Sequence, residues 1–180
     1  MPFRDSIPLQ EYAPGLASIL DKLQGVQITK GNPDLDQKDP HRVYTWVASH
    51  KRIKSDPRNL ALFLHKGSTF RNRADISDIL GTANKKVRAA EPEELQTIGM
   101  SPQYCHPFPN LEFIQNGAIT HFVLDRNLTL MQESCFFPIY SPEERIATAH
   151  IKPIDYLTAM QTITSGGSGQ VIEEAFTGYK

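Results

Sequence analysis

Cys105 and His106 are the residues of this sequence with the chemistry of a nucleophile and its base. Neighbours on an extended chain point to opposite sides, so this thiol and this imidazole do not meet within hydrogen-bond distance. We therefore expect a buried, unreactive Cys105, and an unrelated α+β enzyme with a Cys105 nucleophile is the last-ranked alternative. His106 is a separate catalytic candidate because Pro102, Pro107 and Pro109 stiffen its loop, and rigid loops often carry binding groups.

The sequence contains no motif for a metal, a nucleotide or a catalytic carboxylate pair. Its histidines form neither HxxxH nor HExxH and its two cysteines are far apart, so we expect no metal. Neither GxxxxGK[ST] nor a GxGxxG after a strand is present, and we expect no cofactor. The acidic pairs 93–94 and 143–144 are typical of solvated faces or helix starts. The histidines are His41, His50, His65, His106, His121 and His150.

The composition is that of a soluble protein with one domain. The chain has 180 residues, of which 39% are hydrophobic, and its 19 Lys and Arg residues nearly balance 20 Asp and Glu residues. This length suffices for a hydrophobic core without disulfides, and the net charge of −1 argues against a strongly basic nucleic-acid binder. No apolar run has the length of a membrane span, so we expect a cytoplasmic protein with free thiols.

Basic residues nevertheless gather in three segments. If the strands around Lys66 and Lys86 are neighbours, the three segments form one stripe that meets phosphates. Ordinary solubilising charge is an equally weighted alternative. The segments contain His50, Lys51, Arg52 and Lys54, then Lys66, Arg71 and Arg73, and finally Lys85, Lys86 and Arg88.

The hydrophobic pattern predicts an α+β domain with a mixed, curled sheet and helices on its outside. Asn116-Gly117 predicts a hairpin between strands 111–115 and 118–124, and residues 125–127 predict a tight turn. We expect one domain over residues 1–164 with an irregular arm over 1–13, followed by a Gly/Ser linker and a tail over 165–180 that either docks or stays free. The predicted helices cover 14–24, 73–80, 91–99 and 153–163, and the other predicted strands cover 26–28, 43–49, 60–64, 86–90, 135–140 and 145–151.

Four strings in this order resemble the YbaK/EbsC family, whose members are free-standing aminoacyl-tRNA deacylases related to the editing insertion of bacterial prolyl-tRNA synthetases. The resemblance extends from about residue 43 to residue 160, roughly two thirds of the chain. It implies a small mixed β-barrel with helices packed around it. The strings are KVRAAEPEEL (86–95), IGMSPQYCHPF (98–108), FVLDRNL (122–128) and IATAHIKPIDYL (146–157).

The resemblance also implies an activity, namely hydrolysis in trans of the ester that joins a wrong amino acid to tRNA. The enzymes of this family position the ester and a water, without a metal, a cofactor or a covalent intermediate, and such positioning can supply much of a rate enhancement. The implied partner is the tRNA acceptor end, with an aminoacyl-tRNA synthetase as a second partner and no membrane. The implied substrate-binding residues are Gly99, Pro102, Gln103, Tyr104, Cys105, His106, Pro107, Phe108 and Phe137.

The sequence departs from the family pattern on the substrate side. Thr45 stands where family members usually carry a lysine that contacts the tRNA end, and Gln103 and Tyr104 replace two loop glycines that let a substrate approach the backbone. Phe137 stands where proline-type relatives place a histidine before a late proline. The catalytic candidates are therefore Thr45, Lys66 and His106, and an inactive module that binds tRNA, a small ligand or a protein is the alternative function. Asp125 and Arg126 match a family pair that we expect to form a turn.

Overall fold

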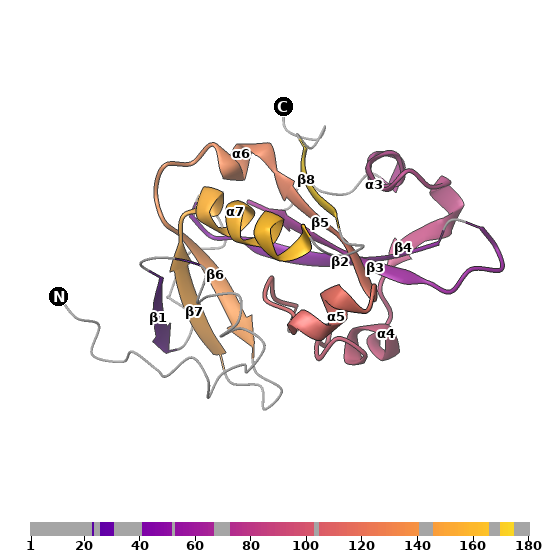
Figure 1. Ribbon diagram of the computed structural model, residues 1–180, viewed down its shortest axis with the longest axis horizontal. Helices are drawn as coiled ribbons and strands as arrows, with labels where there is room; N and C mark the ends of the chain where they lie inside the picture. Colours follow the sequence, from indigo (N-terminus) through magenta and orange to yellow (C-terminus); the bar gives the residue numbers. More distant parts are fainter. Residues whose placement is uncertain are drawn as a thin grey trace.

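The hairpin of β2 and β3 is the centre of the structure (Figure 1). The computed structural model of the chain describes Leu23 and residues 26–30, 41–51, 53–66, 73–102, 105–140, 146–165 and 170–174. Strand β2 (Tyr44–His50) pairs antiparallel with β3 (Asn59–His65) over its whole length. Both strands alternate between the two faces of the sheet, and the predicted strands 43–49 and 60–64 are confirmed.

Three further strands complete a mixed sheet of five, in the order β4-β2-β3-β5-β8. Strand β4 (Val87–Ala89) pairs antiparallel with β2, whereas β5 (Ile119–Asp125) is parallel to β3 and β8 (Gln170–Glu174) is parallel to β5. Residues 170–174 therefore dock on the edge of the sheet, which is one of the two behaviours left open for the tail.

A second sheet has the order β1-β7-β6 and is antiparallel. It contains β1 (Gln27–Lys30), β6 (Cys135–Tyr140) and β7 (Ile146–Ile151).

The two sheets meet at one bridge, between Arg42 and Phe136. There the amide of Val43 donates to the carbonyl of Phe136 over 3.0 Å. The expected α+β class with a mixed sheet is confirmed, but the barrel that the resemblance implies is wrong for the described residues: one bridge does not continue the backbone ladder, so the strands remain two sheets.

Helix α7 (Pro153–Thr164) lies across one face of the five-stranded sheet, and α3 (Arg73–Leu80) covers the other (Figure 1). The larger buried cluster fills the space between the sheets and α7, and it includes Leu62, Phe122 and Tyr156. The smaller cluster packs Phe63 against Ile76 of α3. None of the described helices combines the length and the apolar character that a membrane crossing needs.

The predicted helices over 73–80, 91–99 and 153–163 are confirmed as α3, α4 (Pro92–Gln96) and α7, although α4 is shorter than expected. The strands predicted around residues 28, 88, 121, 137 and 148 are also confirmed. The predicted helix over 14–24 lies outside the described residues, apart from Leu23. A short 3₁₀ turn, η1 (Asn84–Lys86), precedes β4.

The predicted hairpin at Asn116-Gly117 is wrong, because residues 111–115 form helix α5 (Leu111–Gln115) instead of a strand. Gly117 has a φ of 80°, and a glycine in this left-handed conformation also ends helices. Its amide donates to the carbonyl of Ile114 over 3.3 Å, and Asn116 receives the amide of Ala118 on its side chain. The same dipeptide therefore caps a helix before β5 begins.

In place of the tight turn predicted at residues 125–127, β5 ends at Asp125 and a one-turn helix, α6 (Arg126–Thr129), begins. Asp125 is its N-cap, and the carboxylate Oδ1 accepts the amide of Asn127 over 3.0 Å.

Candidate functional site

A loop connects α4 to α5 over residues 99–110, and a hydrogen bond joins it to α7. It begins at Gly99, whose φ of 73° is a left-handed conformation that glycine adopts without strain. Deeper in the loop, the hydroxyl of Tyr156 on α7 donates to the carbonyl of Pro107 over 2.5 Å. Burial raises the pKa of Tyr156 far above its usual value, so the hydroxyl stays protonated and remains a donor. The loop is thus pinned to α7.

Three buried aromatic rings pack against one another where the loop meets α7 and β6. Phe108 lies edge-on to Tyr156 with ring centroids 5.6 Å apart, and Phe137 of β6 stacks on Tyr156 at 5.4 Å. Phe108 and Phe137 are only 1% and 0% exposed. In this structure they are core side chains that position the loop, and their contact with a substrate stays a prediction.

The thiol and the imidazole of the loop are both held in their neutral forms. Burial lowers the pKa of His106 to about 4, and its Nδ1 accepts the amide of Phe108 over 3.3 Å. Burial raises the pKa of Cys105 to about 11, and its Sγ donates to the carbonyl of Ser101 over 3.4 Å. A thiolate is the reactive form of cysteine, so this shift disfavours reaction of Cys105 at neutral pH, although Cys105 is only partly buried and the expectation was a buried residue.

Ser101 is the polar side chain of this loop that the sequence analysis missed. Its Oγ is buried and has no hydrogen-bond partner among the described residues. A buried hydroxyl without a partner costs folding free energy, so such a group calls for an explanation. The sequence signal was its place inside IGMSPQYCHPF, but a serine in a loop is too common to single out.

Thr45 lies on the sheet face that carries this loop. It pairs with Leu64 of β3, and it shares a face with Val43 and Val47, which belong to the larger buried cluster together with Phe108. Lys66 directly follows β3 and is half-buried. The structure therefore brings Thr45 to the loop side of the sheet and places Lys66 at the nearby strand end.

The remaining loop residues of the predicted site differ in their exposure. Gly99 and Pro102 are exposed, and Pro107 is buried. Gln103 and Tyr104 lie outside the described residues.

A cation and two rings meet at the end of β2 that lies nearest to Lys66. The guanidinium of Arg42 sits 4.8 Å from the ring centroid of Tyr44, and Tyr44 stacks on His65 at 5.7 Å with an angle of 18°. Tyr44 alternates with Thr45 along the strand, so this group is on the opposite face of the sheet. It therefore does not line the loop.

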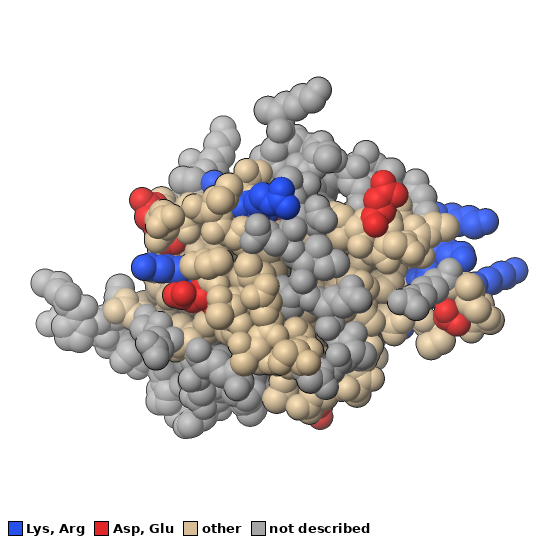
Figure 2. All heavy atoms as spheres, turned by 45° about the horizontal axis from the view of Figure 1, so that its top comes forward, with Lys and Arg blue, Asp and Glu red and all other residues tan. Residues whose placement is uncertain are grey.

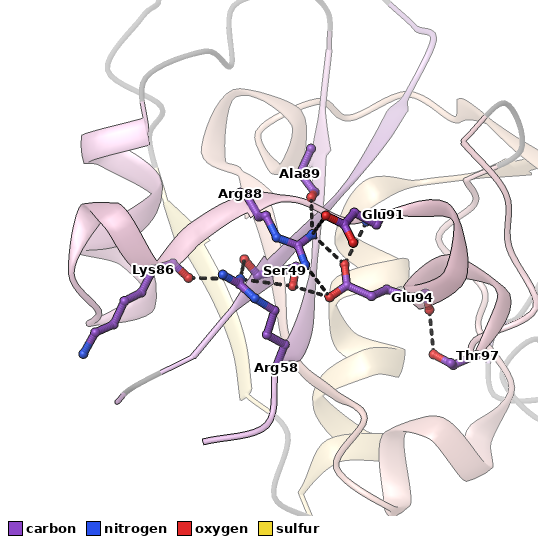
Figure 3. A network of polar contacts seen from close by, with 8 residues as sticks. All are labelled: Ser49, Arg58, Lys86, Arg88, Ala89, Glu91, Glu94 and Thr97. Atoms are coloured by element: carbon purple, nitrogen blue, oxygen red, sulfur yellow. Dashed lines mark hydrogen bonds and ion pairs between the residues drawn. The ribbon is translucent and has the colours of Figure 1, made fainter. Parts of the chain in front are cut away.

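Glu94 ties the first residues of α4 to the sheet (Figure 3). Its carboxylate receives two bonds from Arg88 at 2.8 and 2.9 Å, one from the hydroxyl of Ser49 at 2.9 Å, and the amide of Glu91 at 2.8 Å. Burial raises the pKa of Glu94, but the bonds from Arg88, Glu91 and Ser49 and the charge of Arg88 together bring it below its ordinary value. Glu93 and Glu94 both lie in the first turn of α4, which agrees with the expected helix-start charges, and Glu94 is in addition a structural anion.

A β-bulge brings two histidines to one threonine. Leu60 pairs with Ile119 and Ala61 pairs with His121, so Thr120 is an extra residue in β5. The Oγ1 of Thr120 lies 2.8 Å from Nε2 of His50 and 2.7 Å from Nδ1 of His121. The sequence did not predict this cluster, because it depends on the register of strands that are distant in the chain.

The basic residues do not form one stripe. Lys66 follows the last residue of β3, whereas Lys86 precedes β4, whose Val87 pairs with His50 at the other end of β2. Seven residues of extended chain lie between these ends, which is roughly 20 Å. The condition for a single stripe is therefore not met.

Within the described ranges, His, Cys, Asp and Glu side chains form no group of three or more that could hold a metal ion. Neither the models of known protein families nor the curated proteins give a match to this chain.

Proposed function

We propose that this protein is an aminoacyl-tRNA deacylase of the YbaK-like type that clears mischarged tRNA in trans. The observation that carries the proposal is the loop over residues 99–110, which coincides with a string resembling the family's substrate loop. The loop is anchored by Tyr156 and retains a buried hydroxyl, Ser101, at a cost in stability. Polar groups kept at such a cost are typical of functional sites.

The chemistry of the loop supports hydrolysis by positioning. Cys105 and His106 are a thiol and a neutral, buried imidazole at neutral pH, so neither provides a thiolate or an accessible base. A water adds to the ester carbonyl, the bond to the ribose oxygen breaks, and the ribose oxygen takes the proton that the water loses. A fixed donor such as the Ser101 hydroxyl stabilises the negative charge that develops on the carbonyl oxygen. Thr45 and Lys66 would face the acceptor end.

The test is hydrolysis of tRNA charged with cysteine, alanine or serine, by the wild-type protein and by Ser101→Ala. We expect hydrolysis of one charged species above the spontaneous rate, and about a hundredfold loss in Ser101→Ala. The variant should unfold at the same urea concentration or a higher one, because no hydrogen bond is removed. Ser134→Ala, which removes an exposed hydroxyl, is the control and should keep full activity.

A catalytically inactive binding module is the second candidate function, favoured by the threonine at position 45 where the family has a lysine. A Tyr104→Gly variant separates the two candidates. Hydrolysis by this variant alone would mean that Tyr104 blocks a retained site. Binding of tRNA without hydrolysis by either protein would establish the binding module and rule out the deacylase.

A further inference from the structure

The end of the sheet at the β2–β3 turn concentrates positive charge. Residues 49–58 and 82–88 contain seven of the 19 Lys and Arg residues of the chain, and their one acidic residue is Asp56. Figure 2 shows Lys and Arg side chains gathered at the right-hand end of the molecule, where Figure 1 places this turn and β4. This end of the sheet is therefore basic, although the net charge of the chain is −1.

Four of these seven basic side chains form no ion pair with another described residue. Among the ion pairs between described residues, none includes Lys51, Lys54, Arg58 or Lys85. Asp56 uses its carboxylate to accept the amide of Ile53 within the turn, over 3.3 Å. Among the described residues, the charges of Lys51, Lys54, Arg58 and Lys85 are therefore not compensated by a carboxylate.

The backbone that carries these lysines is held rigidly. The guanidinium of Arg58 donates to the carbonyls of Ser49 and Lys86 over 3.2 and 3.3 Å, which joins the turn to η1. The hydroxyl of Thr82 donates to the carbonyl of Lys51 over 2.6 Å. Binding an anion here would therefore order the ends of lysine side chains and little backbone, and such preorganisation favours binding.

We propose that this basic end binds the sugar–phosphate backbone of tRNA, an inference that rests on the proposed function. Lysines are compact point charges that suit phosphates without reading sequence. Ile53 is 55% exposed at the tip of the turn, and one aliphatic side chain is too little apolar surface for a stable protein interface or membrane insertion. A contact dominated by phosphates fits this surface best.

The basic end is also connected to the candidate site. Glu94 binds Arg88 and Ser49 at this end of the sheet, and α4 continues directly into the loop that begins at Gly99. A tRNA backbone held at the β2–β3 turn is therefore bound to the same rigid unit that carries the loop.

The test measures binding of uncharged tRNA by fluorescence anisotropy at several salt concentrations, with Lys54→Gln, Lys85→Gln and the control Lys152→Gln. All three lysines are exposed, and Lys152 precedes α7, away from the turn. Each of the first two changes should weaken binding about three- to tenfold near 0.1 M salt and lower the slope of log affinity against log salt by about 1. The control should leave both quantities unchanged.

Equal effects of all three changes, or no effect of any, would overturn the inference while leaving the proposed function standing. Absence of tRNA binding by the wild-type protein would overturn both. If Lys54→Gln and Lys85→Gln weaken tRNA binding but no charged tRNA is hydrolysed, the inference stands and the deacylase does not. Binding to vesicles of anionic lipid that these two changes weaken, with unchanged tRNA binding, would reassign the surface to a membrane.

Discussion

At the scale of single residues, burial decides what the loop can do. Cys105 and His106 are the residue types of a covalent mechanism, but desolvation moves the pKa of Cys105 up to about 11 and that of His106 down to about 4. Both shifts favour the neutral form. Ser101 differs from both, because its hydroxyl is neutral and its buried Oγ has no hydrogen-bond partner among the described residues.

The buried His106 should make the protein sensitive to acid. Its pKa in the folded protein, about 4, is below the value of 6.5 expected in the unfolded chain, so the unfolded chain binds the proton more tightly. Stability from this group is therefore complete above pH 6.5 and is lost as the pH falls toward 4, by about 3 kcal/mol.

His106→Asn should remove this dependence while keeping an acceptor for the amide of Phe108. Urea unfolding at pH 7 and at pH 4 measures the difference. If the wild-type protein and the variant lose the same free energy of unfolding between these two pH values, His106 is not the group responsible.

At the scale of elements, the network of Glu94 joins β2, β4 and the start of α4. Glu94→Gln should lower the free energy of unfolding by about 1–2 kcal/mol at pH 7, because a bidentate pair with Arg88 is lost at a partly buried position. The pKa of Glu94 is lowered on folding, so its contribution is present above the unfolded value of 4.5 and fades as the pH falls below it.

Glu93→Gln is the matched control, because Glu93 is the neighbour of Glu94 in α4 and its side chain is exposed. Chemical denaturation should show that the free energies of unfolding of the two variants differ clearly at pH 7 and only slightly at pH 3. An equal effect of both changes at pH 7 would contradict the structural role of Glu94.

Gly99, which follows α4 and has a left-handed backbone conformation, gives a second prediction at this scale. An added Cβ at Gly99 meets no atom within 4 Å, so Gly99→Ala should cost about 1–2 kcal/mol through backbone conformation alone. Gly99→Asn should cost less, because asparagine tolerates this conformation. Thermal unfolding of both variants checks the order, and a cost for Asn equal to that for Ala would show that the added side chain, and not φ, is responsible.

The elements show what the sequence could predict and what it could not. The alternation in VYTWVAS predicted β2, and the short apolar run LALFL predicted β3. The adjacency of Cys105 and His106 predicted that they form no catalytic pair. Asn116-Gly117 failed as a predictor because the dipeptide suits both a hairpin and a helix end, and the local sequence does not decide between them. The bulge at Thr120 depends on pairing with β3, which is 60 residues away in the chain, so no local pattern encodes it.

At the scale of the whole molecule, the loop that we propose to position the substrate lies on one face of the sheet, and the basic residues lie at the end of the sheet with the β2–β3 turn. The charge of the chain is nearly balanced in total, but Lys and Arg gather at one end of the sheet, which is the surface that we propose for phosphates. The same sheet carries Thr45 on its loop side. Substrate binding and hydrolysis would thus depend on separate groups of residues in one rigid scaffold.

The most direct test of the central claim is hydrolysis of tRNA charged with cysteine, alanine or serine by the wild-type protein and by Cys105→Ala, with free amino acid released as the readout. The account predicts that one charged tRNA is hydrolysed faster than it decays spontaneously, and that Cys105→Ala retains this rate. Loss of the activity in a folded Cys105→Ala protein, or no release from any charged tRNA by either protein, would contradict it.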